Sequence, residues 1–178
     1  AEDPTSLDPR QVRLLPSVTL MHMFYEGLTR YDQKGLVVNG IADNIQISPD
    51  GKTYTFHLKK TVWNNGDPLT AEDFVRTWKS ALDPKKPSPN AYQLYHIKNA
   101  QLYRAGKADT IGAIAKGPYT LEVQLEHPLP YFLDLTATHF YYPVHQSNSD
   151  KITNGPFSLE YWKKNNEISA VKNPRYWD

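Results

Sequence analysis

The sequence predicts an α+β fold in which antiparallel hairpins combine with a few helices. Residues 53–58 and 119–126 alternate apolar and polar side chains with the two-residue period of a half-buried strand. Residues 70–82 carry a helix start followed by apolar residues at helical spacing. Because these elements do not follow one another as regular strand–helix–strand units, a doubly wound parallel sheet is disfavoured.

The first helix is expected to follow an extended, proline-rich opening segment. Ser17 is a candidate N-cap, since a serine oxygen can accept a hydrogen bond from a first-turn amide. The helix would cover residues 18–28, with Gly27 near its end. The residues expected on its buried face are Leu20, Met23, Phe24 and Leu28.

Residues 45–47 and 53–58 are predicted to pair as a β-hairpin. The sequence between them, SPDG, is a turn signal, because Pro49 fixes its own φ and Gly51 adopts the left-handed conformation readily. A second strong turn signal, NNGDP, covers residues 64–68.

The clearest helix start lies at Thr70. Its side chain can cap the first amides while Asp73 reaches back, as in a capping box with Asp in place of Glu. The residue before Pro84 disfavours helical geometry, so the helix should end near Asp83. The expected buried stripe is Phe74, Trp78, Ala81 and Leu82.

Three further elements are predicted in the second half of the chain. Residues 93–106 are ambiguous and are assigned as helical, and residues 131–137 form a short helix because Pro130 suits a first turn. Residues 157–172 read as two strands around an Asn-Asn turn. The polar loop of residues 146–150 is the best candidate for a domain boundary.

Composition excludes several classes of function. Twenty Lys and Arg against nineteen Asp and Glu give a net charge of +1, which disfavours a nucleic-acid partner or an anionic membrane surface. No cysteine is present, so disulfides, thiolate zinc sites and cysteine nucleophiles are excluded. The sequence starts at Ala1 without a signal-peptide pattern, and we expect that any signal sequence has been removed.

No catalytic, metal or cofactor motif stands out. The six histidines show no compact ligand spacing, and GxSxG, GxGxxG and Walker sequences are missing. Glu122 and Glu126 lie on the polar face of a predicted strand, where solvent exposure is the default interpretation. The prediction is therefore a protein that is not an enzyme and has no cofactor or metal, although a hydrolase acting on sugars or peptides stays open as an alternative. Tyr92 and Tyr95 follow a proline-rich loop and are candidates for ligand binding.

Three blocks carry a recognisable pattern: LDP at residues 7–9 followed by residues 23–32, then residues 41–84, and residues 152–178. It includes EGL, SPDGKTYTFHL, W-x-NGDP-x-TAEDF and NGPF followed by NPxYWD. In this order the motifs closely resemble the amino-terminal part of the extracytoplasmic solute-binding proteins of peptide ABC importers, the oligopeptide-binding family, family 5.

The resemblance implies an incomplete periplasmic-binding-protein-like lobe with an inserted hairpin and helix subdomain. Residues 1–36 would begin the first-lobe sheet domain, residues 37–145 would be the insertion, and residues 146–178 would return to the first domain. The second lobe would be absent, since relatives continue for several hundred residues beyond NPxYWD. In that family two lobes joined by a hinge enclose the peptide.

The resemblance also implies ligand-binding residues. Relatives contact peptide through the segment after LDP, which here contains Arg13 and Leu15. A basic residue at position 13 would favour a carboxylate or an acidic ligand, and the alternative that Arg13 is merely solvated stays open. Relatives often have Tyr directly after the SP dipeptide, where this chain has Asn90, so Tyr92 is the candidate replacement and Tyr95 lies nearby.

The implied function is a substrate-binding receptor that captures oligopeptides for the membrane permease of an ABC importer. Such a receptor is periplasmic or otherwise extracytoplasmic, with a lipid anchor before Ala1 as one arrangement. Because lobe closure sequesters the ligand, the isolated chain is expected to bind weakly or not at all. The alternative is a shortened relative that acts as a protein–protein interaction module and self-associates through the face left exposed by the missing lobe.

Overall fold

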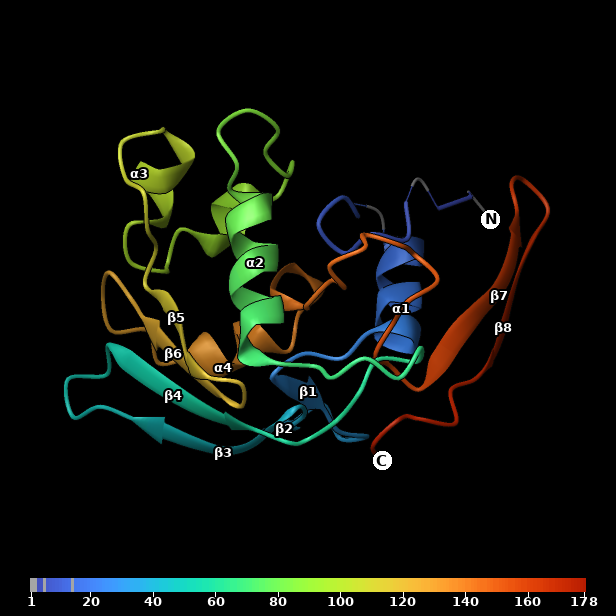
Figure 1. Ribbon diagram of the computed structural model, residues 1–178, viewed down its shortest axis with the longest axis horizontal. Helices are drawn as coiled ribbons and strands as arrows, with labels where there is room; N and C mark the ends of the chain where they lie inside the picture. Colours follow the sequence, from blue (N-terminus) through green and yellow to red (C-terminus); the bar gives the residue numbers. More distant parts are fainter. Residues whose placement is uncertain (1–2, 5, 14) are drawn as a thin grey trace.

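The computed structural model describes residues 3–4, 6–13 and 15–178, without the side chains of residues 15 and 16. It confirms the α+β prediction, since short helices combine with antiparallel strand pairs (Figure 1). The helices are α1 (Leu15–Phe24), α2 (Ala71–Ala81), α3 (Ala100–Arg104) and α4 (Phe132–Thr136), with 3-10 turns η1 (Ala91–Leu94) and η2 (His139–Tyr141). The strands are β1 (Thr29–Tyr31), β2 (Val37–Asn39), β3 (Ala42–Ile47), β4 (Thr53–Leu58), β5 (Ala113–Gly117), β6 (Thr120–Gln124), β7 (Phe157–Lys163) and β8 (Glu167–Lys172).

A four-stranded antiparallel sheet in the order β3-β4-β6-β5 is the centre of the fold. The predicted hairpin of β3 and β4 is confirmed, and its turn places Gly51 at φ +67°. Tyr54 and Phe56 of β4 and Leu121 of β6 are buried on the inner face. The period-two pattern of the sequence therefore separates the core face from the polar face, as expected for a half-covered sheet.

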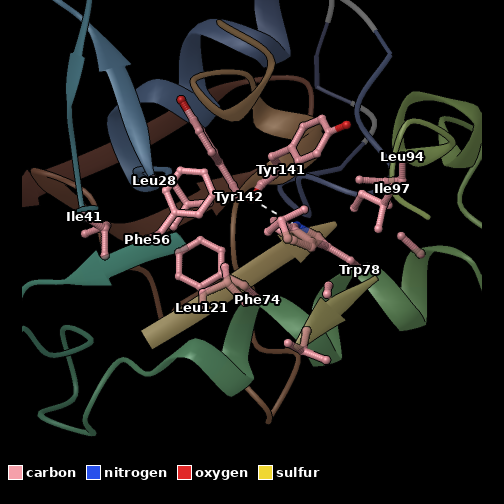
Figure 2. Packing of buried hydrophobic residues seen from close by; sticks show 14 of the residues in the cluster. Leu28, Ile41, Phe56, Phe74, Trp78, Leu94, Ile97, Leu121, Tyr141 and Tyr142 are labelled. Carbon is pink, nitrogen blue, oxygen red and sulfur yellow. Dashed lines mark hydrogen bonds between the residues drawn. The ribbon is translucent and has the colours of Figure 1, made fainter. Parts of the chain in front are cut away.

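Helix α2 packs against β5 and β6 (Figure 1). Its capping box is formed, since the Thr70 N–H donates to Asp73 Oδ2 at 2.8 Å. Trp78 packs edge-on against both Phe74 and Tyr141, with ring centroids 6.0 Å and 5.5 Å apart. The indole Nε1 of Trp78 also donates to the Tyr141 carbonyl at 3.2 Å, so this cluster joins α2 to η2 at the centre of the core (Figure 2).

Helix α1 differs from its prediction at both ends. It begins at Leu15, so Ser17 lies inside the helix rather than at its N-cap, and the Ser17 hydroxyl is buried without a hydrogen-bond partner among the described residues. The helix ends at Phe24 because the next residues leave it to pair with the return segment described below. Met21, which the sequence pattern did not single out, is fully buried, whereas Leu20 is half-buried.

Two other regions depart from the sequence prediction. Residues 93–106 form only the end of η1 and the five-residue α3, so the expected helix is broken into two short pieces. Strand β5 was not predicted, because AIAKG carries no clear alternation and its structure depends on pairing with β6. The predicted C-terminal hairpin is confirmed as β7 and β8, with Asn165 at φ +60° in its turn.

The return segment docks onto the end of α1 through Asn154 and Gly155. The Asn154 amide pairs with the backbone of Glu26: its Oδ1 accepts from the Glu26 N–H at 3.2 Å, and its Nδ2 donates to the Glu26 carbonyl at 3.0 Å. The Gly155 N–H donates to the Phe24 carbonyl at 2.8 Å. A side chain at residue 155 would meet the backbone of Phe24 and Tyr25 at 2.5 and 2.6 Å, which only glycine avoids. In the described residues no helix has the length and apolar character needed to cross a membrane.

This close approach yields a stability prediction. We expect Gly155→Ala to lower the free energy of unfolding by about 1–3 kcal/mol or more, because the added methyl forces two backbone segments apart. Gly117→Ala is the matched control, since a side chain there meets no heavy atom within 4 Å. Equal denaturation midpoints for the two variants in urea would contradict the proposed docking.

Candidate functional site

Two segments that the sequence analysis named as ligand contacts lie together in the structure. The Asn90 Nδ2 donates to the Val12 carbonyl at 2.7 Å, and the Ser88 hydroxyl donates to the Arg10 carbonyl, each across 78 residues of sequence. These bonds join residues 8–13 to residues 83–92. We refer to the surface formed by these two segments as the lip.

The second segment of the lip is anchored to the core. The Ser88 N–H donates to the Ala81 carbonyl at 2.8 Å at the end of α2, and the Tyr141 hydroxyl donates to the Gln93 carbonyl at 2.8 Å. These two bonds fix the backbone of the loop to the core. The Tyr92 side chain on this loop is 58% exposed. Tyr95 is half-buried and packs against the core.

The other predicted ligand residues occupy different positions. Arg13 is exposed at the first segment of the lip, and among the described residues no acidic group lies within ion-pair distance of it. Asn90 is half-buried, and its side-chain amide donates a hydrogen bond to the Val12 carbonyl. Leu15 is the first residue of α1, and its side chain lies outside the described part of the structure. Ligand contact by these residues stays a prediction.

Arg10, in the first segment of the lip, contacts three other residues through its guanidinium. The sequence analysis did not predict these contacts. Its guanidinium pairs with Asp8 at 2.6 Å and donates to Ser80 Oγ at 2.7 Å and to Asn148 Oδ1 at 3.0 Å. The bidentate arrangement with Asp8 is the stronger form of such a pair. Because Ser80 and Asn148 are far from Arg10 in the sequence, no local pattern could have revealed these two contacts.

A cavity of about 610 Å³ opens next to Arg10. Its walls come from both segments of the lip, the end of α2 and the loop of residues 146–150. The lining residues are Asp8, Arg10, Gln11, Ser80, Ala81, Asp83, Lys86 and Asn148. The lining has charged side chains of both signs beside a comparable amount of apolar surface, so a ligand there would meet charged groups as well as hydrocarbon.

His139 lies buried behind Val12 and faces its backbone. Burial lowers the pKa of His139 to about 4, and the nearby His22 lowers it further, whereas the Val12 carbonyl opposes the change. The Nε2 atom has no hydrogen-bond partner among the described residues. The imidazole is therefore held neutral under the lip at ordinary pH.

A second cluster forms around the buried carboxylate of Glu26. It accepts hydrogen bonds from the Tyr176 hydroxyl at 3.0 Å and from the Trp177 indole N–H, and Arg30 approaches it at 3.4 Å. Burial raises the pKa of Glu26, while the bonds from Trp177 and Tyr176 and the charge of Arg30 oppose that rise. Trp177 is also covered by two cations, with Arg30 and Lys59 4.9 Å and 4.3 Å from its ring centroid. The cluster ties the EGL motif to the NPxYWD motif, which explains why both motifs contain these residue types.

His145 forms a third polar group between the turn of residues 64–68 and the loop of residues 146–150. Its Nε2 lies 2.8 Å from Asp67 Oδ2 and its Nδ1 lies 2.8 Å from Ser147 Oγ. The Ser147 N–H also points at Nδ1, at 3.2 Å, so the lone pair that a catalytic base would need is already shared. This group fastens the loop to the turn. Across the part of the chain that the structure describes, no three His, Asp or Glu side chains gather as metal ligands.

Sequence comparisons show which known proteins this chain resembles. The family described as bacterial extracellular solute-binding proteins, family 5 Middle, matches residues 37–178. The chain is 40% identical over 99% of its length to the oligopeptide-binding protein OppA of Bacillus subtilis, of which it covers 35%. It is also 40% identical to the probable deoxycholate-binding periplasmic protein YgiS of Escherichia coli, of which it covers 36%.

Solved structures of peptide-binding proteins superimpose on almost the whole of this chain. The Escherichia coli murein tripeptide binding protein MppA superimposes with a TM-score of 0.93 at 36% identity, over 99% of this chain and 37% of that protein. Haemophilus influenzae OppA in complex with the peptide RPPGFSPFR superimposes with a TM-score of 0.93 at 34% identity and the same coverage. The chain thus spans a little over a third of the length of these relatives.

The buried histidine predicts a pH dependence. Because the pKa of His139 is lowered in the folded state, the unfolded chain binds the proton more readily, and stability should decrease as the pH falls from 6.5 towards about 4. We expect His139→Phe to reduce the slope of the melting temperature against pH over this range. His127→Gln, at an exposed position, should leave the slope unchanged. A His139→Phe slope equal to that of the unmodified chain would show that other groups control the dependence.

The Glu26 cluster predicts a large loss of stability on truncation. We expect Glu26→Ala to cost about 1–3 kcal/mol in free energy of unfolding, because Tyr176 and Trp177 lose a shared buried acceptor, whereas Arg30 keeps its ion pair with Asp178. Asp109→Ala removes an exposed carboxylate that has no hydrogen bond among the described residues and should change stability by less than about 0.5 kcal/mol. Chemical denaturation of both variants measures the difference. A loss for Glu26→Ala as small as that of the control would contradict a structural role for the cluster.

Proposed function

Because the chain belongs to the bacterial extracellular solute-binding proteins of family 5, we propose that it forms part of a receptor that captures oligopeptides for an ABC importer. Relatives named for oligopeptide and dipeptide binding support the proposal, as does the peptide-bound structure of a relative. The proposed place of action is the periplasm or another extracytoplasmic compartment, and the proposed partner is the membrane permease of that importer.

The observation that carries the proposal is the joining of the two ligand-contact segments into one lip. An extended peptide has unpaired N–H and C=O groups along its length, which a strand-like protein edge can pair without reading side chains. In the first segment the carbonyls of Arg10 and Val12 already accept hydrogen bonds from Ser88 and Asn90, so the groups left for a ligand include those of Arg13, whose side chain is exposed. The second segment has an exposed aromatic ring, Tyr92. Bridging waters in a polar site then tolerate many side chains.

We further propose the domain division stated from the sequence, with residues 1–36 and 146–178 in one domain and residues 37–145 inserted. The bonds of Asn154 and Gly155 to Glu26 and Phe24 support it, because they attach the return segment to the first part of the chain. The pairing of β1 with β2 crosses the proposed boundary after residue 36, so the insertion leaves the first domain through a two-stranded ribbon.

A second candidate function is a protein–protein interaction module. The observation that favours it is the presence of partly exposed apolar side chains on both faces of the β7–β8 hairpin, with Phe157 on one face and Tyr161 and Val171 on the other. An apolar strand pair of this kind can support self-association.

Native mass spectrometry distinguishes the two functions. Since closure of two lobes is what sequesters a ligand, we expect the purified chain to be mainly bare and monomeric, with peptide adducts appearing on addition of excess random tripeptides. Tyr92→Ala should reduce these adducts. Tyr131→Ala removes a ring of matched exposure, 53% against 58%, and should not reduce them.

A concentration-dependent dimer that forms without peptide would overturn the proposed receptor function for this chain and support the interaction module. A monomer without adducts at any peptide concentration would show instead that peptide binding requires the second lobe.

A further inference from the structure

The lip carries more basic than acidic side chains. Its two segments contain four basic and two acidic side chains, a net charge of +2. The carboxylate of Asp8 already forms an ion pair with Arg10. Lys85, Lys86 and Arg13 have no ion-pair partner within the described residues. A ligand that approaches the lip therefore meets a surplus of uncompensated cations.

Two side chains of the second segment hold the backbone of the first segment. Ser88 and Asn90 take the carbonyls of Arg10 and Val12, two residues apart. Ser88 in turn accepts the Asn90 N–H at 3.1 Å, so the two side chains act together. Val12 is fully buried, whereas Arg13, the next residue, is exposed. The clamp thus fixes the backbone immediately before Arg13 and leaves its guanidinium outside.

We propose that the lip selects ligands that carry carboxylates, with Arg13 as the contact residue and Ser88 and Asn90 as the positioning residues that hold it in place. The inference rests on the proposed function and names the ligand class of the same site. It also assigns Asn90 a different role from direct ligand contact, because its Nδ2 already bonds to Val12. Arg10 is not the selective cation, since Asp8, Ser80 and Asn148 already engage its guanidinium.

A pair of peptides that differ by one carboxylate tests the ligand class. Ala-Glu-Ala and Ala-Gln-Ala share length and termini, and their binding to the chain is followed by shifts of the amide resonances of residues 10–13 and 88–95. We expect Ala-Glu-Ala to bind up to about fivefold more tightly at low salt, the upper value for an exposed ion pair. Added salt should reduce the ratio.

Charge reversal of Arg13 separates a local contact from the general field of the chain. Arg13→Glu should remove or invert the preference for Ala-Glu-Ala. Lys34→Glu makes the same change in net charge at an exposed position on the turn between β1 and β2, which lies well away from the lip in Figure 1. This control should keep the preference of the unmodified chain.

The positioning role has its own readout in the ligand-free chain. Asn90→Ala and Ser88→Ala should speed hydrogen exchange of the amides of residues 11–13 and lower the Glu-to-Gln preference towards one. Tyr92→Ala should weaken both peptides equally and leave both the exchange rates and the preference unchanged. A residue that only contacts ligand would not alter exchange before ligand is added, so unchanged exchange in Asn90→Ala overturns the positioning role.

The outcomes separate this inference from the proposed function. If both peptides shift the lip resonances with equal affinity, or if Arg13→Glu keeps the full preference, the carboxylate selectivity is wrong while peptide binding stands. If neither peptide shifts these resonances at any concentration, the proposed function of the lip fails and the selectivity fails with it.

Discussion

The pairing of the Asn154 side chain with the backbone of Glu26 is the constraint on which the rest of the arrangement depends. An asparagine amide offers one donor and one acceptor, so it can replace a neighbouring strand for a single residue. By doing so it ends α1 at Phe24, draws Gly155 against the helix terminus and places the β7–β8 hairpin beside α1. The Glu26 carboxylate is then enclosed, and the pair of Tyr176 and Trp177 closes over it.

One buried aromatic residue, Tyr141, connects the hydrophobic core to the lip through hydrogen bonds. Tyr141 accepts a hydrogen bond from Trp78 at its carbonyl and donates one from its hydroxyl to Gln93. The ring is fully buried and packs on Trp78 (Figure 2). It also packs on Phe132. The exposed loop that carries Tyr92 is therefore bonded to a fully buried aromatic cluster, which is how a rigid scaffold presents binding residues on a loop.

Local signals in the sequence were sufficient for the elements that depend on local chemistry. The capping box at Thr70, the Gly51 turn and the alternation of β4 and β6 were all predicted, because each depends on residues within a few positions of one another. The early start of α1 and the existence of β5 were not, since tertiary pairing decides them. At the site, the sequence indicated part of each segment of the lip but not the contacts made by Arg10, Ser88 and His139. Their roles arise from contacts with segments that lie far away along the chain.

The lip also shows why affinity and selectivity need not reside in the same part of a two-lobed receptor. Affinity depends on all contacts and on enclosure of the ligand, whereas selectivity is a difference between two ligands and depends only on the contacts that distinguish them. A clamp that fixes the backbone before Arg13 removes the ordering cost of that contact in advance. A single lobe can therefore bind weakly and still discriminate, because Ser88 and Asn90 act within this chain and require nothing from a second lobe.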